Sequence, residues 1–169
     1  GQGIDSLLAE AEAHYRRAGD ALRCRLVQLR RYSDAGPVYV DDAWDRWQTF
    51  NAGAGDLEVP AVVAWHRFIE AAIQGLRGHL ADSVTAGVRA YRASAATGQI
   101  NSAVFCATNV GIIFDKLNDL ESALEWARRG LEQARRLGSR RLQAQSLGML
   151  GHALLRLQRF EAARPVLEE

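Results

Sequence analysis

Two side chains in this sequence of 169 residues have the types and the spacing of half a metal site. His66 and Glu70 are four positions apart, so on an α-helix the imidazole and the carboxylate would share one face. A zinc site needs further ligands, and the other histidines, at positions 14, 79 and 152, are scattered along the chain. We therefore interpret the pair as a solvated ion pair and predict that the protein binds no metal and no other cofactor.

The sequence also lacks the usual patterns of nucleophilic and phosphate chemistry. It has no Ser–His–Asp or Cys–His signature and no glycine-rich phosphate loop. Cys24 and Cys106 are far apart, and each lies in an apolar helical pattern. This placement predicts buried free thiols in a reducing cytoplasm, rather than a disulfide or a redox pair. We expect no catalysis by these residues, and an enzyme of helical α/α architecture is the disfavoured alternative.

A group of arginines could contact phosphate groups. Arg135, Arg136, Arg140 and Arg141 surround Gly138. Arginines at the end of a helix also complement the negative end of its dipole, which is the commoner arrangement. The net charge of the chain is only +1, so a strongly basic nucleic-acid surface is not expected. We predict that the protein does not bind nucleic acid.

The helices that position these residues follow a period of forty. Leu80, Leu120 and Phe160 each open an amphipathic segment, and Gly98 and Gly138 end two of them. A small residue recurs three positions into each segment, as Ser83, Ala123 and Ala163. A fixed period in this range is typical of stacked helical repeats, none of which buries its apolar face alone. The sequence predicts an all-α solenoid of antiparallel helix pairs, with helices over 80–97, 101–117, 120–137, 140–157 and 160–169 and no strand.

The remainder of the chain is also expected to be helical. Residues 1–58 contain a predicted hairpin, over 5–18 and 20–33, and then a short aromatic helix; residues 59–169 contain the repeats. The last repeat stops half-way, so we expect the natural protein to continue. No apolar run is long enough to cross a bilayer, and we predict no membrane contact.

The segment 109–132 resembles a tetratricopeptide repeat. The family's small and large positions are matched there by Gly111, Phe114, Leu120, Ala123 and Gly130. The next copy matches at Gly151, Leu154, Phe160 and Ala163, and the preceding copy at Leu80, Ser83 and Ala90, with Ala71 or Ala72 in the glycine's place. The period resembles the long-repeat variety found in kinesin light chains and many bacterial regulators. The period alone would also allow HEAT or armadillo repeats, but the small-residue pattern argues against them. The resemblance implies a right-handed TPR-like superhelix.

In such arrays the first helix of each pair lines a groove that binds peptides. The resemblance places Asn109 where an asparagine holds the backbone of the ligand, since its amide can donate and accept. The candidate groove residues implied by the resemblance are Phe105, Thr108, Asn109, Ile112, Lys116, His152 and Arg156. Met149 stands at the asparagine position of the next copy. The alternative is that Asn109 forms only local hydrogen bonds within the array.

Trp44 and Trp47 lie in an acidic stretch, residues 34–58, and allow two interpretations. They could form a docking or self-association surface, and hence a homodimer. They could instead belong to a helix that caps the first repeat, and we favour this cap over the docking surface. Residues 1–58 as a whole could be either a degenerate repeat or a cap.

The sequence thus predicts a protein- or peptide-binding, or sensory, TPR-like region without catalytic activity. The composition is rich in Ala, Arg and Leu and has a single lysine, which suggests a bacterial protein from a GC-rich genome. Similar arrays precede diguanylate cyclase (GGDEF) domains and transcription regulators, so we expect part of a larger cytoplasmic signalling protein. The alternative function is a structural module for homo-oligomerisation.

Overall fold

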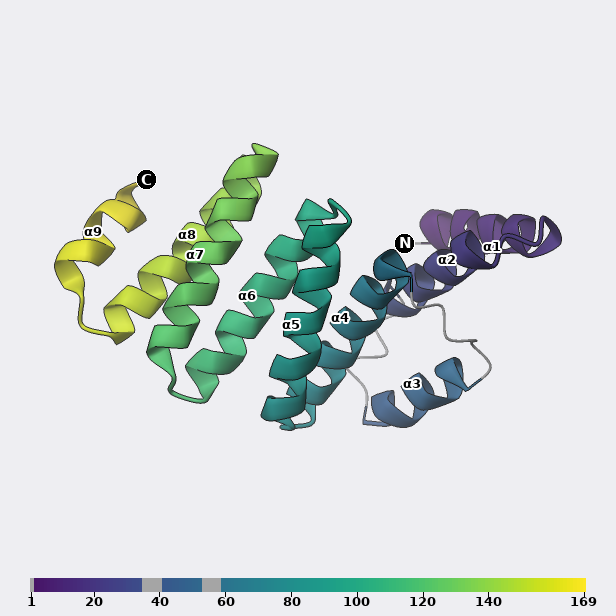
Figure 1. Ribbon diagram of the computed structural model, residues 1–169, viewed down its shortest axis with the longest axis horizontal. Helices are drawn as coiled ribbons and strands as arrows, with labels where there is room; N and C mark the ends of the chain where they lie inside the picture. The colour runs from purple at the N-terminus through teal and green to yellow at the C-terminus, as the bar shows by residue number, and fades with distance from the viewer. Residues whose placement is uncertain (1, 35–40, 53–58) are drawn as a thin grey trace.

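All regular structure in the described residues of the computed structural model is α-helical (Figure 1). The structure describes residues 2–34, 41–52 and 59–169. The helices are α1 (Gln2–Arg17), α2 (Ala21–Asp34), α3 (Ala43–Asn51), α4 (Pro60–Leu76), α5 (Leu80–Ala96), α6 (Ile100–Lys116), α7 (Leu120–Leu137), α8 (Arg140–Arg156) and α9 (Phe160–Glu168). The predicted all-α class is therefore confirmed. No helix of these residues is long and apolar enough to span a bilayer.

From α4 onward the helices start at a regular interval. The first residues of α4 to α9 are Pro60, Leu80, Ile100, Leu120, Arg140 and Phe160. The helices from α4 to α8 contain 17 or 18 residues each. The period of forty is thus two units of one helix and one short turn. Because the turns are so short, consecutive helices run in opposite directions and lie side by side (Figure 1).

Each turn in this row contains one residue in the left-handed conformation. These residues are Gly78, Gly98, Asn118, Gly138 and Gln158, with φ between 58° and 81°. After α4 and α6 the next N–H donates to a carbonyl five residues back, from His79 to Gln74 and from Asp119 to Phe114, both at 2.9 Å. This is the Schellman geometry that ends helices. Asn118 and Gln158 adopt it without being glycine, at a steric cost.

The row has two different sides. Every helix from α4 to α9 packs against the next one, and α6 also contacts both α4 and α8. Among the described residues α5 and α7 make no such contact with each other. The first helices of the pairs are therefore the more closely spaced ones, and they share one face of the row.

Small residues allow this close packing. A Cβ atom at Gly87 of α5 would lie 2.6 Å from Cγ2 of Val110 on α6. On α4, Ala71 is buried and its carbonyl accepts a hydrogen bond from the Ser83 hydroxyl at 2.7 Å. Ala72 is only half-buried, so Ala71 is the residue that faces α5. Of the two alanines considered for the small position, Ala71 is therefore the one at the contact between α4 and α5.

The packing predicts opposite effects for two glycine substitutions. Gly87→Ala should destabilise the protein by about 1–3 kcal/mol, because the new methyl group would collide with the buried Val110. Gly148→Ala should stabilise it by about 0.5–1 kcal/mol, because an alanine Cβ in this helix meets nothing within 4 Å. Urea unfolding followed by circular dichroism would measure both. Equal effects of the two variants would contradict this packing.

Candidate binding groove

Four candidate residues of α6 lie along one face of that helix. Phe105, Asn109, Ile112 and Lys116 follow one another at intervals of three or four residues, and all four are half-buried or exposed. This face of α6 lies between α4 and α8, which α6 contacts on its two sides. One helix therefore brings these four predicted residues together. Thr108, also on α6, does not share this face, and His152 and Arg156 belong to α8.

Three of these residues line a pocket between α4 and α6, which we name the amide pocket. Asn109, Ile112 and Lys116 form one wall, Ala72 and Leu76 of α4 form the other, and Ser83 and Gly87 of α5 lie at its floor. Its volume is about 200 Å³. In the part of the chain that the structure describes, the Asn109 side chain has no hydrogen-bond partner. The amide is thus placed at a pocket rather than used within the array.

Thr108 was a wrong choice for the groove. Its side chain is buried, and its hydroxyl donates to the carbonyl of Val104 at 3.0 Å, within the same helix. It faces α7, where a Cβ at Gly130 would lie 4.0 Å from its Oγ1. Adjacent positions on a helix point about 100° apart, so Thr108 cannot share the exposed face of Asn109.

The candidates on α8 are held by a carboxylate of α6. Arg156 donates to Asp115 at 2.9 Å and to Asn118 at 3.2 Å, and His152 Nε2 lies 3.6 Å from Asp115 Oδ1. These contacts join α8 to the end of α6. Both side chains remain exposed, so they lie at one edge of the face but are partly engaged with the protein itself.

A second pocket on the same face was not predicted as a site; we name it the aromatic pocket. It lies where α2, α4 and α6 meet and has a volume of about 220 Å³. It is lined by Arg30, Ser33, Ala64, Trp65, Phe68, Ser102 and Phe105. Only Phe105 was among the candidates. Trp65 and Phe68 belong to α4, and no local signal in the sequence places α2 beside them.

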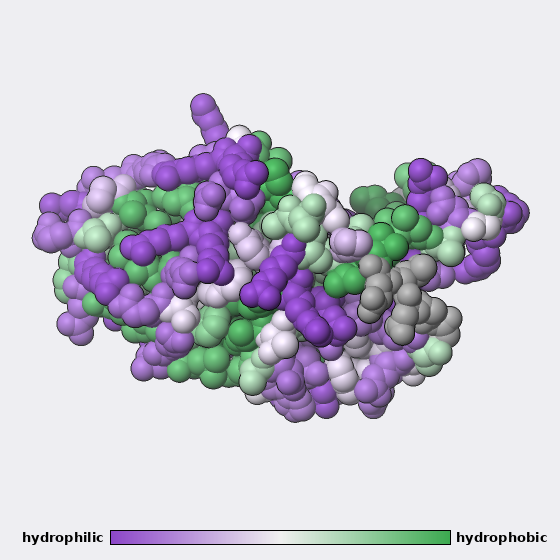
Figure 2. All heavy atoms as spheres, viewed as in Figure 1, coloured by the Kyte–Doolittle hydropathy of each residue, from purple (hydrophilic) through white to green (hydrophobic). Residues whose placement is uncertain are grey.

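Apolar surface alone does not single out a site. The face of the molecule shown in Figure 2 mixes hydrophilic and hydrophobic side chains along the row of helices. The two pockets differ from that background because each is a hollow lined mainly by apolar atoms, and both lie between α4 and α6.

The two candidate interface tryptophans have different environments. Trp47 is 2% exposed, and its ring contacts Tyr32, Phe50 and His66 at centroid distances of 5.1, 5.8 and 4.6 Å. Trp44 is half-buried, with the guanidinium of Arg77 5.1 Å from its ring. Trp47 thus belongs to the core between α2, α3 and α4, where it cannot contact a partner. This arrangement favours the capping interpretation of α3.

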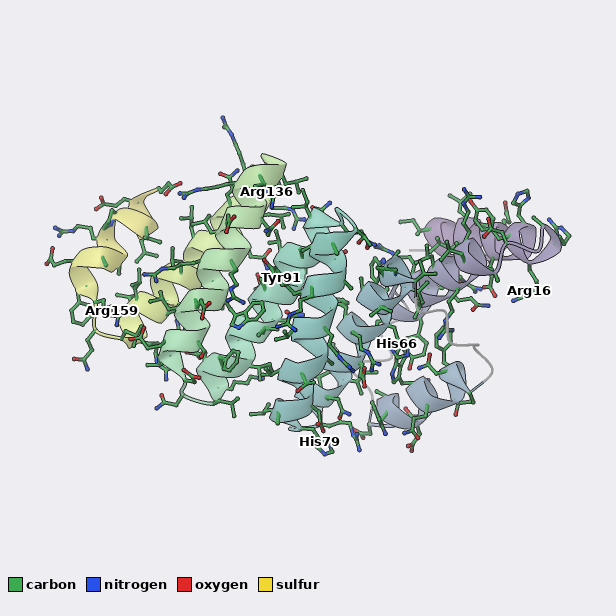
Figure 3. The ribbon with its side chains drawn as sticks, viewed as in Figure 1. Arg16, His66, His79, Tyr91, Arg136 and Arg159 are labelled. Carbon is green, nitrogen blue, oxygen red and sulfur yellow. The ribbon has the colours of Figure 1, made fainter. Side chains whose placement is uncertain are left out.

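His66 and Glu70 are not placed as a metal site. His66 lies between α4 and α3, against Trp47, whereas His79 lies at the start of α5 (Figure 3). Glu70 forms an ion pair with Arg67. The described residues contain no group of three or more His, Cys, Asp or Glu side chains that could hold a metal ion.

Of the arginines near Gly138, Arg135 forms an ion pair with Glu169 at 2.6 Å.

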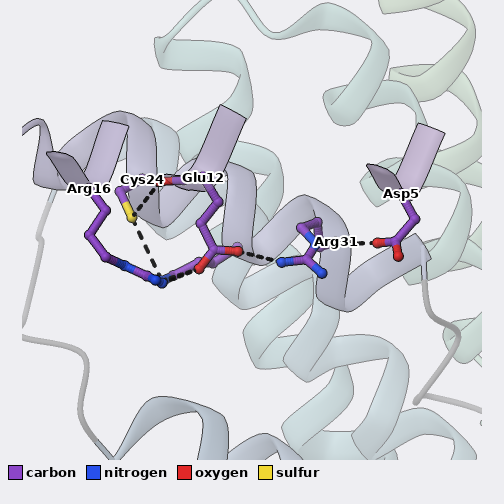
Figure 4. Close-up of polar contacts among 6 residues, drawn as sticks. Asp5, Glu12, Arg16, Cys24 and Arg31 are labelled. Carbon is purple, nitrogen blue, oxygen red and sulfur yellow. Dashed lines mark hydrogen bonds and ion pairs between the residues drawn. The ribbon is translucent and has the colours of Figure 1, made fainter. Parts of the chain in front are cut away.

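A buried carboxylate joins the two helices of the N-terminal hairpin (Figure 4). Glu12 accepts hydrogen bonds from Arg16, Arg31 and Gln28, and Arg31 also donates to Asp5 at 3.2 Å. Burial raises the pKa of Glu12, but the hydrogen bonds from Gln28 and Arg31 and the charges of Arg16 and Arg31 outweigh it, so the pKa is lowered. The cluster is satisfied internally and serves the fold.

Both cysteines are free and buried, as predicted. Burial raises the pKa of the Cys106 thiol to about 12, against a smaller opposite effect of Ser94. Since the thiolate is the nucleophile, we expect iodoacetamide at about pH 8 to leave Cys106 unmodified in the folded protein and to alkylate it after unfolding. Peptide mass mapping would measure this. Modification of Cys106 in the folded state, at the rate of an exposed thiol, would contradict its burial.

The Glu12 cluster predicts a dependence of stability on pH. The stabilisation by a carboxylate of lowered pKa is complete above its unfolded pKa of about 4.3 and is lost as the pH falls through the folded value. Glu12→Gln should therefore lower the free energy of unfolding by about 1.5–3 kcal/mol at neutral pH, and the difference from wild type should vanish in acid. Glu10→Gln, on an exposed position of the same helix, is the control. An equal loss in acid and at neutral pH would contradict the ionic role.

The candidate site is a helical face with two pockets. No family model matches the chain, and comparison with curated proteins finds no similar sequence. The groove therefore has to be interpreted from its own geometry. That geometry offers two hollows of side-chain size. Beside one lies the Asn109 amide, which has no hydrogen-bond partner among the described residues, and beside the other lies Arg30.

Proposed function

We propose that this chain is a TPR-like solenoid that binds a linear segment of a partner protein along the face shared by α4, α6 and α8. The observation that carries the proposal is the pair of pockets between α4 and α6 on that face. Phe105 and Ile112, one from each pocket, are seven residues apart on α6, so the pockets lie about 10 Å apart along it. Two side chains about three positions apart in one extended peptide could fill them, because an extended chain advances about 3.3 Å per residue.

The pocket sizes favour side chains over a larger ligand. Sites for drug-sized molecules usually have volumes of about 300–1,000 Å³, and the two pockets have about 200 and 220 Å³. Each is therefore suited to one side chain. A peptide backbone between them would pass Asn109, whose amide can donate and accept a hydrogen bond at once.

The helix packing supports the TPR-like interpretation. Gly111 of α6 faces α7, where its Cβ position is 3.6 Å from the Ala123 carbonyl and from Cβ of Trp126. Such a contact between the small positions of paired helices is what the resemblance implies. The first helices contact one another and the second helices do not, which suits a row curved towards α4, α6 and α8 and hence a concave binding face. A right-handed superhelix remains part of the proposal.

The setting of the domain is proposed by analogy alone. Arrays of this kind occur ahead of diguanylate cyclase domains in bacterial regulators, and binding of a ligand there would bias an attached output domain. We place this chain in the same class, as a non-catalytic recognition region of a larger cytoplasmic protein.

Asn109→Ala should weaken peptide binding without unfolding the protein. Peptides would first be selected on the immobilised wild-type protein from a random linear library, and their affinities then measured by fluorescence anisotropy. Loss of a hydrogen bond of about 0.5–1.5 kcal/mol corresponds to an affinity about two- to tenfold lower. The melting temperature should not change. Asn101→Ala, on an exposed position of the same helix, is the matched control, and an equal affinity of the two variants would contradict the role of Asn109.

A further inference from the structure

We propose that the aromatic pocket receives a large apolar or aromatic side chain from an acidic segment of a partner protein, and that Arg30 binds a carboxylate next to that side chain. This inference rests on the proposed function and adds the class of peptide. It also makes the N-terminal hairpin part of the binding site, because Arg30 and Ser33 belong to α2.

The walls of the pocket suit an apolar ring. Trp65 and Phe68 lie edge to face, with ring centroids 6.1 Å apart and planes at 86°, and Phe105 faces them from α6. Aromatic side chains prefer such offset and edge-to-face neighbours. Among the described residues of the lining, Ser33 and Ser102 are the only side chains with a hydroxyl group, so a strongly polar group would find few partners there.

Arg30 favours a negatively charged group on the ligand. Its guanidinium lies 5.7 Å from the centroid of the Trp65 ring, and its Nε donates to Asp34 at 2.8 Å. This ion pair is exposed on both sides and is therefore weak, and it uses one of the five donors of the guanidinium. The others can bind a carboxylate in the forked geometry that arginine prefers. A cationic ligand would meet this guanidinium at the rim, although aromatic pockets otherwise accept cations.

The helices that share this face contain more basic than acidic residues. The helices α4, α6 and α8 contain five basic and two acidic residues, whereas α5, α7 and α9 contain seven and six. The two carboxylates, Glu70 and Asp115, are already paired with Arg67 and Arg156. Lys116 beside the amide pocket and Arg141 beside Phe105 form no ion pair with a described carboxylate. Lys116 and Arg141 are thus two positive charges beside the pockets that no described carboxylate pairs, and an acidic peptide would neutralise them.

The test is the composition of the selected peptides and its dependence on Arg30. We expect the random library to yield peptides in which a large apolar or aromatic residue neighbours Asp or Glu. Arg30→Gln should weaken their binding about tenfold, as for the loss of a charge-assisted hydrogen bond, and added salt should weaken wild-type binding. Arg23→Gln is the matched control, because Arg23 is on the same helix, pairs with Asp20 and lies 5.9 Å from a Tyr15 ring.

A second pair of variants tests the pocket without removing a packed ring. Ser102→Trp should fill the pocket and abolish binding, whereas Asn101→Trp, one position away on an exposed site, should not. Circular dichroism would verify that both are folded. If Ser102→Trp does not fold, the smaller Ser102→Leu takes its place.

The outcomes separate this inference from the proposed function. Peptides that bind but are basic, or lack a large apolar residue, would overturn the inference and leave the function standing. Equal affinities of Arg30→Gln and Arg23→Gln would do the same. Indole-3-acetate that binds as tightly as the peptides would assign the pocket to a small aromatic acid instead. A library that yields no binding peptide at all would contradict the proposed function itself.

Discussion

The close approach of neighbouring helices at small residues is the constraint on which the rest of this structure depends. Gly87 leaves no room for a methyl group against Val110, and Gly111 lies against the backbone of Ala123. Short turns, each with one left-handed residue, return the chain at the same point of every unit. Since interiors are close-packed, helices held at this distance have one available arrangement. That arrangement puts α4, α6 and α8 on a common face.

The groove is a consequence of that packing. Once one side of α6 is buried against α5 and α7, the helical period alone sends Phe105, Asn109 and Ile112 to the opposite side. Small residues on α4, such as Ala72 and Gly75, leave the space that becomes the amide pocket. Small residues thus have two effects. On the buried side they bring helices together, and on the face of α4 and α6 they leave hollows.

Local signals predicted the repeat and missed what depends on distant segments. The helix starts were predictable because apolar periodicity and glycine both act within one turn of helix. The turn residues Asn118 and Gln158 were not, since only their equivalence to glycine twenty residues away marks them. Thr108 was misplaced because one position on a helix changes the face. The aromatic pocket could not be predicted, because it requires α2 to lie beside α4 across residues that follow no repeat.

Polar groups are satisfied differently in the N-terminal hairpin and along the face of α4, α6 and α8. In the N-terminal hairpin the carboxylate of Glu12 is surrounded by three donors, so its charge stabilises the fold. Along the groove the Asn109 amide, Lys116 and Arg141 lack comparable partners among the described residues. Such groups contribute little to the fold and would be hydrated in the absence of a ligand. Polar side chains without partners inside the protein are expected at sites that bind a ligand. These groups gather beside two apolar hollows on one face, and the hairpin contributes Arg30 to the same face, which is the arrangement that the proposed binding function requires.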